Sequence, residues 1–366
     1  MKVEVVVVSK EIIKPSSPTP DLLRKYQLSY IDQIAPPLFM PYIYFYPADG
    51  RSSNWERSNR MKESLPEALT RFYPLAGKLV DRLYVDCNDV GVEFFQAKAE
   101  VKLSEILSNP IPGELNKFLP HDPNDFRDFC TAVQVSFLTC GGMAVGFVVS
   151  HKIADAVSMG MFINSWAAIT RGDSDIPYPK FEGATLFPPR NLGSQSDLVI
   201  KERPVTKLFV FSKSKIDALK DKYAKINGGR LRPTRIEALS TFVWSRFMAS
   251  TQAKSNDNKI YSLIEPIINL RPRFEPPLTN YYFGNIWWPI GATLTMTDKD
   301  YEKESFKLVG KIREAITSVN RDYVAKLREG LIPKLDIIDE HLVRFGFTSL
   351  CRFPLYDVDF GWGKPI

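Results

Sequence analysis

A chain of 366 residues is long enough for two domains of ordinary size or one large domain. Its 44% of hydrophobic and 25% of charged residues are typical of a folded globular protein. The net charge of +6 is modest for this length and lacks a Lys/Arg cluster interleaved with aromatic residues, which argues against nucleic-acid binding. No apolar run approaches the roughly 18 residues that span a bilayer, so we expect no membrane association.

The four cysteines are scattered without CxxC spacing, which indicates neither a zinc site nor a disulfide framework. A reducing, cytoplasmic location is therefore expected. Charged residues interrupt the valine-rich opening 1–13, which we interpret as a strand and not as a signal peptide.

The first half of the chain mixes strand and helix patterns. Apolar residues recur at helical spacing across 55–72. Runs of aromatic and β-branched residues predict strands at 42–47, 91–97, 131–140 and 143–150. The glycines of TCGGMA suit a tight turn between the last two strands. These patterns predict a mixed α/β fold.

A segment rich in Pro, Gly, Ser and Asp follows, and it reads as a crossover between domains. We expect an N-terminal domain over 1–185, a linker over 186–204 and a C-terminal domain over 205–366. In the second domain, Thr234 and Glu237 form a capping-box pattern that predicts the start of a helix.

That helix is expected to be followed by a strand over 260–270 and a helical region over 300–330. No internal repeat is present.

His151 stands directly after the strand predicted at 143–150, at the edge where open sheets place reactive groups, and Asp155 follows near a helix start. This pair can form a catalytic base with its support. The same pattern also fits a histidine bonded to a nearby carbonyl and an aspartate that caps the helix. The other histidines, His121 and His341, lie in unpatterned surroundings, so we expect no metal site. G-x-S-x-G, P-loop and G-x-G-x-x-G motifs are absent.

A second motif lies near the end of the chain, where 359–363 reads DFGWG. HKIAD at 151–155 followed by DFGWG resembles the BAHD family of plant CoA-dependent acyltransferases. FYPLAGKL at 72–79 and the segment from NLRPRF to YFGN at 269–285 extend the resemblance over nearly the whole chain. It is closest to the branch of alkaloid O-acetyltransferases.

The resemblance implies an α/β fold of two chloramphenicol-acetyltransferase-like domains with mixed sheets and a solvent channel between them. It implies that His151 takes a proton from an acceptor hydroxyl that attacks the thioester of acetyl-CoA or another acyl-CoA. An unperturbed imidazole pKa of about 6.5 suits that task near neutral pH. The resemblance also implies a monomer with a small-molecule alcohol acceptor and no permanently bound cofactor.

Other site residues are assigned through the same resemblance. Asp155 is expected to turn away from the imidazole and pair with Arg271 or Arg273. The DFGWG loop, with Asp359, Gly361, Trp362 and Gly363, is expected to be structural.

For the nucleotide of CoA, we expect contacts at the helix start with Thr234, Arg235 and Arg232, because free N–H groups at a helix N-terminus suit a phosphate. A solvated loop that carries arginines is the alternative.

Two departures from the family pattern set the remaining alternatives. Where the family has Thr-Ser-Trp beside the acyl site, this sequence has Thr348, Ser349 and Leu350, and leucine cannot donate a hydrogen bond. The sequence also stops soon after DFGWG, and an exposed strand edge is expected there. These departures leave a transfer-inactive, ligand- or partner-binding relative as the alternative to an active acyltransferase. Without the resemblance, a histidine-dependent hydrolase of unknown fold is a third interpretation.

Overall fold

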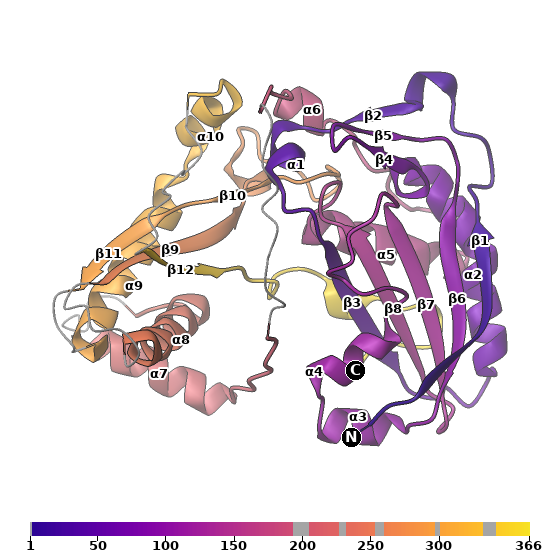
Figure 1. Ribbon diagram of the computed structural model, residues 1–366, viewed down its shortest axis with the longest axis horizontal. Helices are drawn as coiled ribbons and strands as arrows, with labels where there is room; N and C mark the ends of the chain where they lie inside the picture. Colours follow the sequence, from indigo (N-terminus) through magenta and orange to yellow (C-terminus); the bar gives the residue numbers. More distant parts are fainter. Residues whose placement is uncertain (1, 193–204, 227–231, 253–259, 297–300, 332–341) are drawn as a thin grey trace. The chain divides into compact units, whose positions relative to one another are not determined.

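The computed structural model describes residues 2–192, 205–226, 232–252, 260–296, 301–331 and 342–366, which form two compact units (Figure 1). Unit 1 comprises Met1–Leu208, Thr279–Ile286 and Phe353–Ile366. Unit 2 comprises Phe209–Leu278 and Trp287–Arg352. No helix among the described residues is long and apolar enough to cross a membrane.

A five-stranded mixed sheet forms the centre of unit 1. Its spatial order is β1-β6-β7-β8-β3, and only the β6–β7 pair is parallel. The strands are β1 (Val5–Ile13), β3 (Phe39–Tyr46), β6 (Val92–Ala99), β7 (Thr131–Leu138) and β8 (Met143–Ser150). The strands predicted at 42–47, 91–97, 131–140 and 143–150 are therefore confirmed, as is the mixed α/β class.

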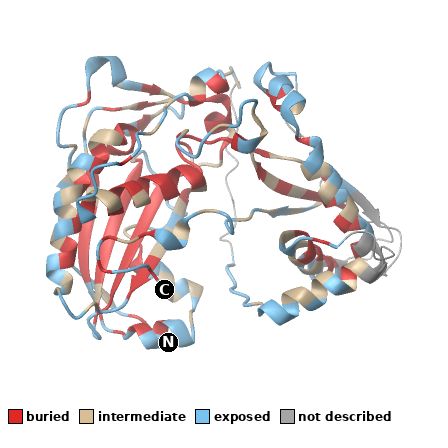
Figure 2. Cartoon of the chain, turned by 180° about the vertical axis from the view of Figure 1, so that it is seen from behind, coloured by how far each residue is buried: buried red, intermediate tan, exposed pale blue. Residues whose placement is uncertain are grey.

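Helices cover both faces of this sheet. Side chains of α2 (Asn54–Arg71) and α5 (Ala156–Arg171) share one hydrophobic core with the strands. A second core lies against α3 (Leu103–Ser108) and the short turn after α4 (Pro112–Leu115). Every residue of β8 is buried, and Figure 2 shows the central strands in red. The strand that leads to His151 is thus held on both sides.

Local sequence signals set the starts of the two long helices of unit 1. Ser53 and Glu56 form a capping box at α2, in which each side chain accepts a hydrogen bond from the other residue's backbone N–H. Asp155 caps α5, and Gly172 ends it in the left-handed conformation at φ +86°. The smaller elements of unit 1 are β2 (Lys25–Gln27), β4 (Lys78–Val80), β5 (Tyr84–Asp86), α1 (Tyr30–Ile34) and α6 (Gly183–Leu186).

Unit 2 is built around β9 (Ile260–Asn269). This strand pairs antiparallel with β10 (Trp287–Pro289) and β11 (Ala292–Met296) and parallel with β12 (Leu342–Phe347). The helices are α7 (Lys213–Ile226), α8 (Arg235–Gln252), α9 (Tyr301–Ser318) and α10 (Arg321–Arg328). Side chains of α8 and α9 form a core with the sheet.

The predicted capping box at Thr234 is confirmed. The backbone N–H of Thr234 donates to the Glu237 carboxylate, and the N–H of Glu237 donates to the Thr234 hydroxyl. Glu237 also accepts two hydrogen bonds from Arg313 on α9, at 2.9 and 2.6 Å.

The two units differ from the expected domain boundaries at the C-terminal end. The DFGWG segment, expected in a domain over 205–366, belongs to unit 1 together with Thr279–Ile286. The reason is specific packing: the Tyr46 hydroxyl donates to the carbonyl of Val358, and the Phe360 ring lies edge-on against Trp166 of α5. Most of the expected linker, 193–204, lies outside the described residues.

Candidate active site

His151 follows the last residue of β8, and backbone hydrogen bonds fix its position. Its N–H donates to the carbonyl of Leu38 at 2.9 Å. The ring Nδ1 lies 3.2 Å from the carbonyl oxygen of Ala154. Because a carbonyl can only accept, this contact requires a hydrogen on Nδ1 and leaves a lone pair on Nε2 of the neutral ring.

The surroundings of His151 favour this neutral ring. The side chain is partly buried, and burial lowers the pKa of His151 below its ordinary value of 6.5. The backbone of His151 itself, the charge of Asp155, the Ala154 carbonyl and the Asn285 side chain act in the opposite direction but do not reverse the shift. A neutral imidazole whose lone pair is on Nε2 can accept a proton from a hydroxyl group at that nitrogen.

Asp155 is the N-cap of α5 and is 6% exposed. One carboxylate oxygen accepts the N–H of Ser158 at 2.9 Å, and the other accepts the N–H of Ile286 at 3.1 Å. The carboxylate therefore joins the start of α5 to a segment that follows it by about 130 residues. The helix-capping interpretation of Asp155 is confirmed.

The proposed partners of Asp155 lie in the other unit. Arg271 is fully buried and Arg273 is partly buried, both in a short 3-10 turn, Arg271–Arg273, of unit 2. The ion pair of Asp155 with either arginine stays a prediction.

Residues 284–286 connect the HKIAD turn to α1. The Ser158 hydroxyl exchanges two hydrogen bonds with the backbone of Gly284, at 2.9 and 3.0 Å. The Asn285 amide donates to the carbonyl of His151 at 2.7 Å and to the Asp32 carboxylate at 2.8 Å. Sequence reasoning did not assign a role to Asn285 or Asp32, and the only signal was the YFGN tetrapeptide that contributed to the family resemblance.

Asp32 is fully buried and accepts four hydrogen bonds. One oxygen receives the backbone and side-chain N–H groups of Asn285, and the other receives the N–H and hydroxyl of Ser29. Burial raises the pKa of Asp32, while these hydrogen bonds act to lower it. Four donors around one carboxylate compensate much of the cost of removing it from water.

The DFGWG segment forms a tight turn in unit 1. One carboxylate oxygen of Asp359 accepts the N–H groups of Gly361 and Gly363, at 2.8 and 2.9 Å. Both glycines have positive φ, +107° and +98°, which side chains other than glycine rarely adopt. Trp362 stacks on Phe360 and is buried. This geometry supports the structural role expected for the motif, which remains a prediction.

The residues expected to contact CoA lie at the start of α8 in unit 2. Thr234, Arg232 and Arg235 are exposed. Arg232 is paired with Asp221 of α7 at 3.0 Å, and the Thr234 hydroxyl already accepts the N–H of Glu237. The capping box thus occupies the backbone N–H groups of Thr234 and Glu237, which could otherwise bind a phosphate. Of the three residues, Arg235 is therefore the strongest candidate for a contact with CoA.

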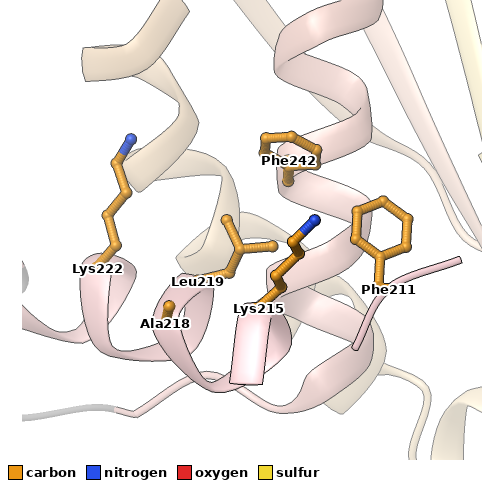
Figure 3. A pocket seen from close by; sticks show the side chains of 6 residues that line it. All are labelled: Phe211, Lys215, Ala218, Leu219, Lys222 and Phe242. Carbon is orange, nitrogen blue, oxygen red and sulfur yellow. The ribbon is translucent and has the colours of Figure 1, made fainter. Parts of the chain in front are cut away.

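The remaining expected residues, Thr348 and Leu350, are exposed in the segment that follows β12. A cavity of about 310 Å³ also lies in unit 2, but it contains none of the expected site residues. Figure 3 shows Lys215 extending toward two phenylalanine rings in this cavity. The cavity is lined by Phe211, Lys215, Ala218, Leu219, Lys222 and Phe242.

Comparisons of the sequence and of the structure with known proteins point to the same family. A model of the Transferase family matches residues 1–366. The chain is 37% identical to stemmadenine O-acetyltransferase of Catharanthus roseus, over 98% of this chain and 86% of that protein. It is 36% identical to vinorine synthase of Rauvolfia serpentina, again over 98% of this chain and 86% of that protein.

Two solved structures extend the comparison. The crystal structure of vinorine synthase aligns with a TM-score of 0.85 and 36% identity, over 99% of this chain and 87% of that chain. F. sporotrichioides TRI101, crystallised with coenzyme A and T-2, shares the fold at 15% identity, with a TM-score of 0.67 over 93% of this chain and 87% of that chain.

Proposed function

The chain belongs to the Transferase family of BAHD acyltransferases, and we propose that it moves an acetyl group from acetyl-CoA to a hydroxyl of a plant alkaloid, with His151 as the general base. The enzyme class and the fold of two chloramphenicol-acetyltransferase-like domains agree with the sequence-based predictions. The donor, the acceptor and the role of His151 belong to the proposal.

The contact between His151 Nδ1 and the Ala154 carbonyl is the observation that carries the proposed mechanism. It places the hydrogen of the neutral ring on Nδ1 and its lone pair on Nε2, and burial is what keeps the ring neutral. Nε2 takes the proton of the acceptor hydroxyl as that oxygen attacks the thioester carbon, which gives a tetrahedral oxyanion. When the C–S bond breaks, the CoA thiolate leaves and receives the proton from the imidazolium. The products are the ester and free CoA, and His151 returns to its neutral form.

The proposed acceptor and donor rest on the relatives. Stemmadenine O-acetyltransferase is named for acetyl transfer to oxygen, and it is one of the relatives with the highest identity. An acyl-CoA co-substrate is supported by the coenzyme A present in the TRI101 complex, whose fold this chain shares. The proposal treats acetyl-CoA as a co-substrate and includes no permanently bound cofactor.

Replacement of His151 by alanine tests the proposal. Purified protein is incubated with acetyl-CoA and a panel of hydroxylated alkaloids, CoA release is followed with a thiol reagent, and products are identified by mass spectrometry. We expect His151→Ala to lower transfer by about 10²- to 10⁴-fold, the usual contribution of general-base assistance, while acetyl-CoA still binds.

A matched control removes a different histidine of unit 1. His121 is partly buried and bonded to Glu93, and His121→Ala should transfer within a few-fold of the parent. Transfer by His151→Ala at the parent rate would remove His151 from the mechanism. CoA release without an alcohol would indicate hydrolysis, and binding without release would indicate a transfer-inactive relative.

A further inference from the structure

The backbone of His151 is held by hydrogen bonds from both of its peptide groups. Its N–H donates to Leu38, and its carbonyl oxygen accepts the Asn285 amide at 2.7 Å. The next residue, Lys152, is 4% exposed, and its ammonium group donates to the carbonyl of Gln33 in α1 at 2.7 Å. The turn that carries the imidazole is thus tied to α1 and to residue 285, which is far away in the sequence.

The hydrogen-bonding capacity of Asn285 matches its two acceptors. An amide NH₂ group has two hydrogens, and here one goes to Asp32 and the other to the carbonyl of His151. A carboxylate and a carbonyl accept but do not donate, so the amide must present its nitrogen to both. Asn285 and Asp32 are fully buried, which makes an unmet partner costly.

We propose that Asn285 is a positioning residue for acyl transfer, and that Asp32 orients its amide so that it holds the backbone of His151 in place. Asn285 acts through this backbone contact, and its side chain also raises the pKa of the His151 ring against the larger effect of burial; it does not take part in proton transfer. The inference rests on the proposed function of His151. It predicts that loss of the amide displaces the imidazole from its contact with Ala154.

Asn285→Ala is the direct test, and Asn164→Ala is its matched control. Asn164 also donates its amide to two backbone carbonyls in unit 1, those of Gly160 and Pro354, but it has no hydrogen bond to the HKIAD turn. Asn285→Ala should lower kcat by about 10²-fold, the scale of a misplacement of about 1 Å at a reacting group. The KM for acetyl-CoA should stay within about threefold of the parent value.

A spectroscopic measurement reports the position of the ring without any substrate. The sequence has three histidines, so ¹⁵N-histidine labelling gives few signals, and those of His151 are assigned by their loss in His151→Ala. We expect the parent ring to carry its hydrogen on Nδ1. Asn285→Ala should change this tautomer distribution. It should also move the midpoint of the acid limb of kcat/KM further below pH 6.5, because the contacts of His151 with the Asn285 side chain and the Ala154 carbonyl both raise its pKa. Asn164→Ala should change neither.

Asn285→Ser keeps the test decisive if the alanine variant does not fold. A hydroxyl has one hydrogen and can serve only one of the two acceptors, so this variant should fall between the parent and Asn285→Ala. The inference is overturned if a folded Asn285 variant shows the parent's His151 signals and the kcat of Asn164→Ala. Absence of transfer by the parent would instead count against the proposed function, and the tautomer comparison would still decide the role of Asn285.

Discussion

The replacement Asp155→Ala separates a structural role for this carboxylate from a direct catalytic one. Alanine removes the helix cap, which costs about 0.5–2 kcal/mol. It also leaves the N–H of the fully buried Ile286 without its acceptor, a loss of about 1–3 kcal/mol. We therefore expect the free energy of unfolding to fall by about 1.5–5 kcal/mol, together with a loss of transfer activity.

Asp155→Ser is the matched variant. Serine caps helices about as well as aspartate, so the contact with Ser158 should persist and only the contact with Ile286 should be lost. Its stability should lie above that of Asp155→Ala by about 1 kcal/mol. Urea unfolding gives the free energy of unfolding of both variants. Backbone hydrogen exchange in a peptide over 279–290 should be faster in each variant than in the parent.

Two results would contradict this reasoning. If the free energy of unfolding of Asp155→Ala is within about 0.5 kcal/mol of the parent value while transfer is lost, Asp155 acts as a partner of the imidazole. A loss well above about 5 kcal/mol would indicate that the change strands a buried arginine, because a broken buried ion pair alone costs about 3–5 kcal/mol. That outcome would support the ion pair with Arg271 or Arg273.

Two further predictions concern pH and CoA. Because burial lowers the pKa of His151, the acid limb of kcat/KM should have its midpoint below pH 6.5, and a midpoint at or above 6.5 would contradict the burial argument. The same shift destabilises the fold in acid, because the unfolded chain takes up the proton below about pH 6.5 while the folded site does not. Arg235→Ala should raise the KM for acetyl-CoA by about 10- to 100-fold if Arg235 binds a phosphate, since a charged hydrogen bond contributes about 1.5–3 kcal/mol. Arg246→Ala, further along the same helix, is the control, and an equal KM in both variants would rule out that contact.

Local patterns predicted the parts of the site that local forces create. The apolar run at 143–150 predicted that His151 follows a strand. Asp155, four residues later, was predicted to lie near a helix start, and it is the N-cap of α5. The Thr234 and Glu237 pair was recognisable because a capping box spans only four residues.

Contacts between residues that are distant in the sequence could not be predicted from such local patterns. Asn285 and Asp32 are 253 residues apart, and no periodicity records which buried amide meets which buried carboxylate. Likewise, the sequence order placed DFGWG in the C-terminal half, whereas the hydrogen bond from Tyr46 to Val358 joins it to unit 1. Such pairings follow from the topology of the chain and from the need of each buried polar group for a partner.

Unit 1 is built from three separate segments of the chain, which affects the order in which it can fold during synthesis. During synthesis, β8 and His151 leave the ribosome well before residues 279–286, and these leave well before Phe353–Ile366. Domains generally fold as they emerge, but this one can complete its core only after a whole second unit has been made. A nascent chain that ends before residue 285 can have its sheet and its histidine, but it lacks the amide that holds the histidine in place.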